Sequence, residues 1–151
     1  MSAQHLHGSA PAVPPPAAAR PAIAPAIRYG DLVRSSGQTA HVDGVNIATG
    51  LVGREVDVET ARHAAWQCSR NVIAAIAEVV DLELVESVVR VTVFVASTPE
   101  FSQQHLVADA ATAYFHHVFG ERGVHTRAAI GVASLPTGSP VEVEAIVRVV
   151  R

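Results

Sequence analysis

Hydrophobic positions recur along the chain with two different periods after residue 22. Small and apolar residues stand three or four positions apart from Asp57 to about Val79, which predicts an amphipathic helix with Asp57 as its N-cap. Valine alternates with other residues from Leu84 to Ala96, and this alternation predicts a strand. We expect four valines of the strand to face the core: Val89, Val91, Val93 and Val95.

A second helix follows this strand in the pattern. Thr98 and Pro99 are typical of an N-cap and a first helical position, and Gly120 is typical of a helix stop. The alternating segments 126–134 and 141–150 predict two final strands joined by a turn.

The region before the first helix predicts shorter elements. Residues 23–38 predict two short strands around a turn at Gly30 and Asp31, and residues 39–56 a loop with room for one more strand. The resulting order of strands and helices predicts an α+β fold, a sheet of about six strands with both helices packed on one face. Residues 1–22 are rich in Pro and Ala, so we expect a flexible arm there and one domain over 23–151.

Composition narrows the function classes. The chain has 151 residues, a formal net charge of −3 and no lysine, which argues against a nucleic-acid-binding platform. It has no apolar run long enough for a membrane helix, so we expect no membrane partner. The single cysteine, Cys68, excludes an intrachain disulfide and fits a reducing, cytoplasmic location.

The segment from Phe119 to Pro136 holds the main candidate for chemistry. Arg127 is followed there by small and apolar residues, so its guanidinium is expected to face a groove that captures a carboxylate or a phosphate. His105, His116 and His117 have no carboxylate or thiolate partners at metal-ligand spacing, so no metal site is predicted.

The predicted final hairpin separates Arg127 from Glu142. A turn near Thr137 and Gly138 would pair Glu142 with Ala133, which lies about 20 Å along the strand from Arg127. If the two side chains share a site, that site must lie between subunits, as a symmetric ring of heterologous contacts allows.

Several of these segments resemble one known family. They are Arg127-x-x-x-Gly131-Val132-Ala133-x-Leu135-Pro136, Val141-Glu142-Val143-Glu144-Ala145, Ser36-Gly37-Gln38 and Val91-Thr92-Val93-Phe94-Val95. Together they resemble the Rid (reactive intermediate deaminase) or YjgF family, often catalogued as endoribonuclease L-PSP. The likeness covers about residues 23–151, and Phe119-Gly120-Glu121-Arg122-Gly123-x-His125-x-Arg127 is similar to one subgroup of the family.

The resemblance implies a chorismate-mutase-like fold, a homotrimer and three clefts between subunits. It implies hydrolysis of enamines or imines of amino acids to keto acids and ammonia, without a cofactor. In that scheme Arg127 binds the substrate carboxylate and Glu142 positions or activates the attacking water. The remaining substrate-binding positions that it implies are Ser36, Gly37, Asp109, Ala129 and Ile23.

Two positions depart from the family pattern. Ile23 stands about where family deaminases carry an aromatic hydroxyl, and Asp109 stands where an asparagine is common. Three functions therefore stay open at this stage. They are an imine deaminase acting on a small carboxylate substrate, a trimeric carboxylate-binding or regulatory protein without catalysis and, least favoured by the acidic composition, a ribonuclease.

Overall fold

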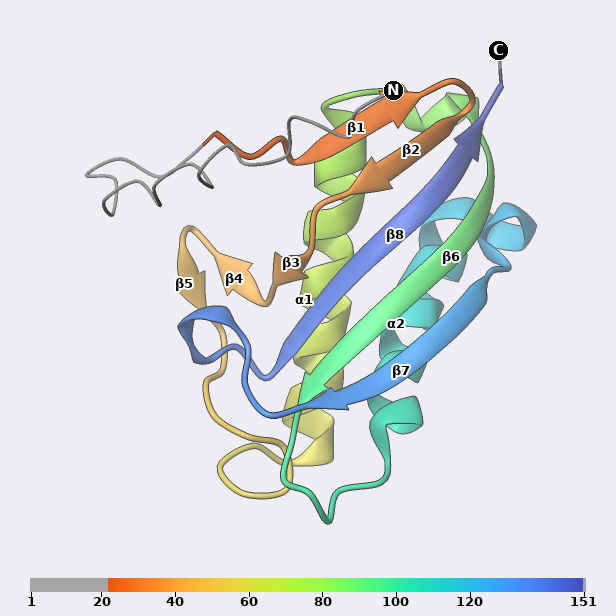
Figure 1. Cartoon of the computed structure of the whole chain (residues 1–151). Helices are drawn as coiled ribbons and strands as arrows, with labels where there is room; N and C mark the ends of the chain where they lie inside the picture. Colours follow the sequence, from red (N-terminus) through yellow and green to blue (C-terminus); the bar gives the residue numbers. More distant parts are fainter. Residues whose placement is uncertain (1–21, 151) are drawn as a thin grey trace, which may run out of the picture.

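The computed structural model describes residues 22–150 and contains a mixed β-sheet with two helices on one face (Figure 1). Almost all of the predicted arm, residues 1–21, lies outside this part of the chain. The sheet has six strands, in the order β1-β2-β8-β6-β7, with the short β3 also paired to β8. Its strands are β1 (Ala26–Tyr29), β2 (Leu32–Ser35), β3 (Gln38–Thr39), β6 (Val85–Ala96), β7 (Thr126–Val132) and β8 (Val141–Val149). This confirms the predicted α+β fold class.

The segment before the first helix holds more short strands than predicted. A two-residue turn joins β1 to β2, with Tyr29 paired to Leu32 and Gly30 at a φ of +64°, as the sequence predicted. After β3, a separate two-stranded sheet is formed by β4 (His41–Val42) and β5 (Val45–Asn46).

Helix α1 (Val58–Ala77) forms where the periodicity predicts it. The side chain of Asp57 accepts a hydrogen bond from the backbone N–H of Thr60 at 2.8 Å, which satisfies one of the free donors of the first turn. The buried face is built mainly from small residues, and these let the helix lie close to the sheet. The buried residues are Ala61, Ala64, Ala65, Cys68, Ser69, Val72, Ile73, Ala75 and Ile76.

Helix α2 (Gln104–Phe119) begins later than predicted, so the assignment of Thr98 and Pro99 to its start is wrong. The N–H of Thr98 donates to Val52 O, and the N–H of Phe101 donates to Thr98 O, so this stretch is a turn tied to another loop. The predicted stop is correct, because Gly120 caps the helix with a φ of +58°. Neither α1 nor α2, nor any other helix within residues 22–150, is long and apolar enough to cross a membrane. Three short 3₁₀ segments complete the helices: Leu82–Leu84, Gly120–Gly123 and Pro136–Gly138.

The central strand β6 contains an irregularity that changes which valines face the helices. The register against β8 shifts between Val88 and Arg90, as a β-bulge does. As a result Val88 is buried, whereas Val89, which was predicted to face the core, is 38% exposed. The other three predicted valines, Val91, Val93 and Val95, are fully buried.

The last two strands do not form the predicted hairpin. Strand β7 pairs in parallel with β6, and β8 pairs antiparallel with the other edge of β6, so β6 separates them (Figure 1). The β6-α2-β7 unit is a parallel crossover, which leaves β8 to fill the place between β6 and β2. The loop between β7 and β8 is instead bonded to the segment before α1. Gly50 N–H donates to Gly138 O, and the Asn46 side chain donates to Thr137.

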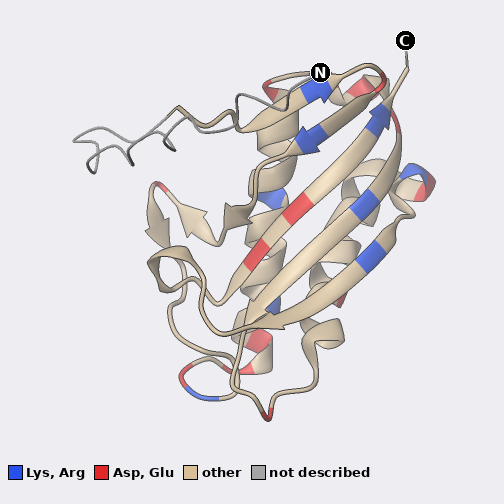
Figure 2. Cartoon of the chain, in the orientation of Figure 1, with Lys and Arg blue, Asp and Glu red and all other residues tan. Residues whose placement is uncertain are grey.

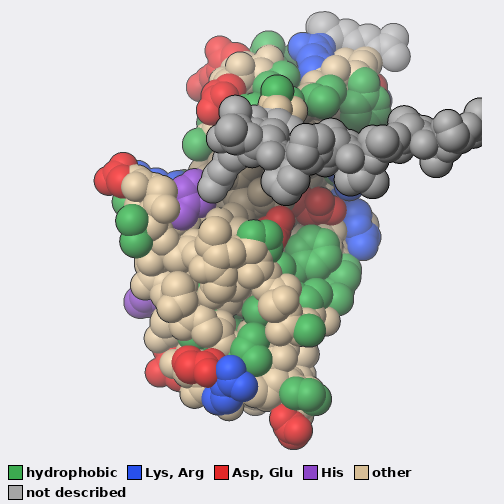
Figure 3. All heavy atoms as spheres, turned by 60° about the vertical axis from the view of Figure 1, so that its left-hand side comes forward, with side chains coloured by type: hydrophobic (Ala, Val, Ile, Leu, Met, Phe, Trp, Pro, Cys, Tyr) green, Lys and Arg blue, Asp and Glu red, His purple; other side chains and the backbone are tan. Residues whose placement is uncertain are grey.

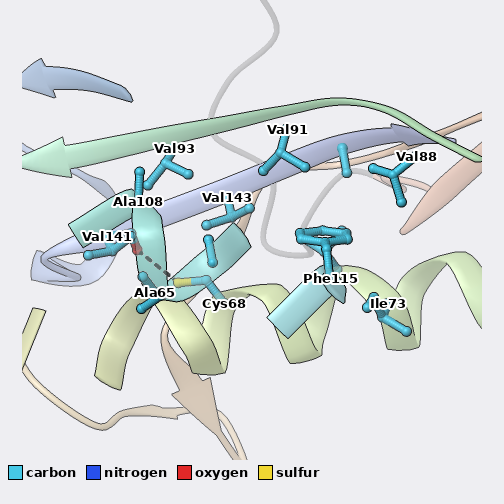
Figure 4. Close-up of a cluster of buried hydrophobic side chains, with 14 of the residues drawn as sticks. Ala65, Cys68, Ile73, Val88, Val91, Val93, Ala108, Phe115, Val141 and Val143 are labelled. Atoms are coloured by element: carbon cyan, nitrogen blue, oxygen red, sulfur yellow. Dashed lines mark hydrogen bonds between the residues drawn. The ribbon is translucent and has the colours of Figure 1, made fainter. Parts of the chain in front are cut away.

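The core lies between the sheet and the two helices (Figure 4). It is built from valines of β6 and β8, alanines of the helices and Phe115, which is fully buried. Cys68 lies in this layer and its thiol donates to Val141 O at 3.3 Å. Burial raises the pKa of the Cys68 thiol well above its ordinary range, so this cysteine serves packing.

The other face of the sheet is covered by no helix within residues 22–150 (Figure 1). Alternation along β8 places Glu142 and Glu144 on this open face, because Val141, Val143 and Ala145 face the helices. Figure 2 shows the two acidic positions of β8 between strands that carry arginines. The space-filling view of Figure 3 shows acidic side chains next to hydrophobic ones on the side of the molecule that is turned forward.

Candidate functional site

Arg127 lies on the edge strand β7 and points to the helix side of the sheet. Its backbone is aligned with Val91 of β6, which faces the helices. Its Nη1 donates to Asp109 Oδ1 at 2.9 Å and to Thr112 Oγ1 at 3.0 Å, both on α2. The Arg127 side chain is 26% exposed and that of Asp109 is 51% exposed, so the pair is open to solvent at one side. Two of the predicted site residues are therefore in direct contact.

A histidine that the sequence interpretation did not assign to the site supports this arrangement. His125 Nδ1 lies 2.6 Å from Gly123 O, and its Nε2 lies 3.1 Å from Thr112 Oγ1. A carbonyl oxygen only accepts, so Nδ1 carries the hydrogen in the neutral ring and Nε2 accepts from the Thr112 hydroxyl. That hydroxyl oxygen is then oriented to accept from Arg127. His125 directly precedes β7 and stands two residues before Arg127, which is the sequence signal that points to this contact.

The imidazole of His125 is held in its neutral form. Burial lowers the pKa of His125, and the nearby charges of His116 and Arg127 lower it further, against the opposing effect of the hydrogen bond to Gly123 O. The hydrogen-bonded chain from His125 through Thr112 to Arg127 is therefore intact at neutral pH.

Glu142 and Gly37 form a second contact, on the open face of the sheet. A Cβ built at Gly37 would lie 1.9 Å from Glu142 Oε1, so only glycine allows the carboxylate to lie against this backbone. Burial, followed by the charge of Glu144, raises the pKa of Glu142 above its ordinary value. No hydrogen bond or ion pair joins the Glu142 carboxylate to any residue in 22–150.

Of the other predicted site residues, Ser36 directly precedes Gly37 in this second contact, and Ile23 lies in the segment to which Ser36 is bonded. The Ser36 hydroxyl donates to Ala24 O at 2.7 Å, and its N–H donates to Pro25 O, so Ser36 anchors the segment that enters β1. Ile23 precedes that segment and is 74% exposed.

A surface groove of about 450 Å³ adjoins Ser36 on the same side. Tyr29 lies in it with an exposed ring, and Arg34 pairs there with Glu144 at 3.6 Å. The groove therefore holds an aromatic hydroxyl, the group absent at Ile23, although it comes six residues later. Alternation with Ile27 on β1 is the signal that places Tyr29 on this face. The groove is lined by Ala24, Ala26, Ile27, Tyr29, Arg34, Ser35, Ser36 and Glu144.

Ala129 belongs with Arg127 and not with Glu142. It stands two residues after Arg127 on β7, is aligned with Val93 of β6, and packs against the edge of the core. Its small side chain leaves space next to the guanidinium.

The two groups of predicted residues lie apart within one chain. Arg127 is aligned with Val91 and Glu142 with Phe94, three residues further along β6 and on its opposite edge. This amounts to about 10 Å along the strands and about 10 Å across them, and the two side chains also leave opposite faces of the sheet. The prediction that Arg127 and Glu142 do not meet within one chain is consistent with this geometry, although the hairpin used to derive it is wrong.

Comparison with known proteins assigns the fold to a family. The sequence pattern of the family described as Endoribonuclease L-PSP matches residues 15–149. The chain belongs to this family. The match confirms the resemblance to Rid/YjgF proteins that the residues of β6, β7 and β8 carry.

Two relatives of the Endoribonuclease L-PSP protein are similar over most of their length. Protein TCP17 of Trypanosoma cruzi is 40% identical over 135 residues, which cover 83% of this chain and 84% of the relative. The crystal structure of Atu1372 from Agrobacterium tumefaciens, a protein of unknown function, is 44% identical with a TM-score of 0.80, covering 83% of this chain and 80% of Atu1372.

A third, more distant protein, from Shewanella oneidensis, shares the fold. It is 22% identical with a TM-score of 0.82, covering 90% of this chain and 91% of that protein. The arrangement of sheet and helices is therefore kept at low sequence identity, and the side chains on it decide the function.

Proposed function

We propose that this protein hydrolyses 2-imino acids to 2-keto acids and ammonia in clefts between the subunits of a homotrimer. The observation that carries the proposal is the pair of separated half-sites. Arg127 stands at the sheet edge with an oriented guanidinium, and Glu142 stands on the open face with a carboxylate that has no partner within residues 22–150. Within residues 22–150, the Arg127 half has a group that can bind a carboxylate but no free base, and the Glu142 half has a free carboxylate but no cation in contact with it.

Arg127 binds the substrate carboxylate in this proposal. Thr112 and Asp109 both use its Nη1, so Nε and Nη2 make no hydrogen bond to residues 22–150. These two nitrogens can donate to the two oxygens of a carboxylate in the bidentate geometry that suits guanidinium groups. Ala129 and the neighbouring small residues leave room for the carbon next to the carboxylate.

Glu142 acts as the general base. Burial moves the pKa of Glu142 up towards neutral pH. A general base works best when its pKa lies near the working pH, because it is then largely ionised and still binds a proton well. Glu142 takes a proton from the water that adds to the carbon of the protonated imine, and it returns this proton to the amine nitrogen of the tetrahedral adduct. The C–N bond then breaks while the hydroxyl loses its proton to form the keto group, and the ammonia takes up that proton. The overall change converts a protonated 2-imino acid and one water into a 2-keto acid and an ammonium ion, with atoms and charge in balance.

The uncovered face of the sheet supports the proposed trimer. Its open face carries exposed hydrophobic side chains, among them Ile27, Tyr29 and Ile130, which a monomer leaves in water. A ring of three subunits in heterologous contact would bring the β7 edge of one chain next to the open β8 face of its neighbour. Arg127 of one subunit and Glu142 of the next would then border one cleft.

A coupled assay tests the proposal. An amino-acid oxidase generates 2-imino acids in the presence of the purified full chain, and the release of 2-keto acid is followed. We expect release faster than the uncatalysed rate, and loss of the acceleration in Arg127→Ala. Arg54→Ala is the matched control, because Arg54 is an exposed loop residue whose one ion pair within residues 22–150 is with its neighbour Glu55.

Two results would overturn the deaminase. One is no acceleration with any 2-imino acid, together with carboxylate binding that Arg127→Ala abolishes, which would instead support a binding or regulatory protein. The other is a monomer by sedimentation at the assay concentration with full activity, which would remove the shared cleft.

A further inference from the structure

The charge of Arg127 is already compensated within its own chain. Asp109 Oδ1 lies 2.9 Å from the guanidinium, and the lowered pKa of His125 keeps that ring uncharged at neutral pH. Thr112, the remaining hydrogen-bond partner, carries no charge. A simple monoanion that approaches Arg127 therefore meets an ion pair instead of an isolated cation, and it is repelled by Asp109 at close range.

The ion pair nevertheless leaves both of its members open to a ligand. Asp109 uses only Oδ1, and its Oδ2 has no hydrogen-bond partner within residues 22–150. Arg127 likewise has Nε and Nη2 without partners in that part of the chain. A negative acceptor and two positive donors thus stand side by side at the surface, and Asp109 is half exposed.

We infer that Asp109 makes this site selective for ligands that carry a cationic nitrogen next to the carboxylate, such as α-amino acids and protonated 2-imino acids. The carboxylate binds Nε and Nη2 of Arg127, and the N–H groups of the ligand donate to Asp109. The ligand carries one positive and one negative charge. Its carboxylate therefore pairs with Arg127 and its cationic nitrogen pairs with Asp109. The inference rests on the proposed function, because it concerns the same Arg127 half-site.

Selectivity of this kind also matters for the proposed reaction. Protonation of an imine nitrogen makes the imine carbon more electrophilic, and a carboxylate that accepts from that nitrogen favours the protonated form. The 2-keto acid product has no such nitrogen, so it cannot donate to Asp109, and its carboxylate meets an Arg127 whose charge Asp109 already balances. Asp109 therefore favours binding of the substrate over binding of its product.

Calorimetric titration of the full chain with four probes tests the inference. The probes are L-alanine, L-lactate, pyruvate and ethylamine, which vary the nitrogen and the carboxylate separately. We expect L-alanine to bind the wild type about tenfold more tightly than L-lactate or pyruvate, the size of one hydrogen bond to a charged group. Asp109→Asn keeps the shape and the acceptor towards Arg127, so we expect it to cancel or reverse this preference.

The controls separate failure of the inference from failure of the proposed function. Asp43→Asn is the matched control, because Asp43 is exposed in the turn between β4 and β5 at a φ of +50° that asparagine also adopts; it should keep the wild-type preference. Equal affinities for L-alanine and L-lactate in both wild type and Asp109→Asn would overturn the selectivity while leaving the Arg127 site in place. Failure of every acid to bind, with or without Asp109, would overturn the carboxylate site and the proposed function with it.

Discussion

The two halves of the candidate site differ in how far one chain completes them. In the Arg127 half the guanidinium is fixed by hydrogen bonds to Asp109 and Thr112 of α2, and Thr112 is in turn bonded to His125, just before β7. In the Glu142 half the carboxylate lies against the backbone of Gly37 and has no hydrogen bond or ionic partner within residues 22–150. One chain thus orients the Arg127 guanidinium, and it leaves the Glu142 carboxylate without a partner among residues 22–150.

Electrostatics follows the same division. In the Arg127 half a positive and a negative charge stabilise each other, and the neighbouring histidine stays neutral. In the Glu142 half burial and Glu144 both disfavour the ionised carboxylate, so its pKa is raised. An unpartnered acid with a raised pKa is typical of a functional group, and its position at an uncovered sheet face fits the proposal that a second chain completes the site.

Glu142→Gln should show the difference most strongly. We expect the turnover of 2-imino acids to fall by about 10²- to 10⁴-fold, the usual contribution of a general base. The same change should stabilise the fold at pH 7. A raised folded-state pKa means that stability is fully present below the ordinary value of 4.5 and is lost as the pH rises through the folded pKa, and glutamine does not titrate.

Assays of turnover and thermal unfolding at pH 4 and pH 7 measure both effects. Glu78→Gln, at the exposed C-cap of α1, serves as the control and should change neither. Unchanged turnover in Glu142→Gln would remove its catalytic role.

Gly37→Ala should have the next largest effect, because it moves the carboxylate without removing it. The new Cβ would lie 1.9 Å from Glu142 Oε1, so the side chain must shift. We expect about tenfold slower turnover or more, with little change in the free energy of unfolding, because the atoms that the new Cβ would meet belong to the flexible end of the Glu142 side chain. In the Glu142→Ala background the same glycine change should also leave stability unchanged, and a loss there would show that Gly37 is needed for another reason.

The smallest of the three effects is expected at His125, in the Arg127 half, and it concerns the pH dependence of stability. Its folded-state pKa is lowered, so the neutral ring contributes stability above the ordinary value of 6.5, and this stability is lost as the pH falls through that value. Unfolding measured from pH 8 to pH 5 should show a slope of at most about one proton that His125→Gln removes. The exposed His63 is the control, and His63→Gln should keep the slope; a slope unchanged in His125→Gln would contradict a neutral, buried ring.

How much the sequence predicts depends on how local the signal is. Helix α1 follows from Asp57 and a stripe of small residues within one segment, and the turn at Gly30 follows from two adjacent residues. The start of α2 was mistaken because Thr98 is used by a distant loop at Val52. The pairing of β7 with β6, and the bulge that exposes Val89, depend on contacts between distant segments that periodicity does not contain.

The site follows the same rule. Arg127, Glu142 and Gly37 are visible in motifs, and the contact of Arg127 with Asp109 joins two residues that the resemblance selects. Thr112 was missed because nothing in its local sequence marks it, and for Tyr29 alternation with Ile27 indicates the face of the strand but not the groove. Only the packing of α2 against β7 brings Thr112 to the guanidinium, and only the face of β1 brings Tyr29 to the groove beside Glu144.

Complementation between two inactive variants tests the central claim most directly. Arg127→Ala and Glu142→Ala are each expected to be inactive, and the two are unfolded together and refolded as a mixture so that subunits exchange at random. In a cyclic trimer every mixed assembly regains one intact cleft out of three, so about a quarter of the wild-type activity should return. Two inactive proteins that stay inactive after mixing, although mixed trimers are detected by mass, would contradict a site shared between subunits.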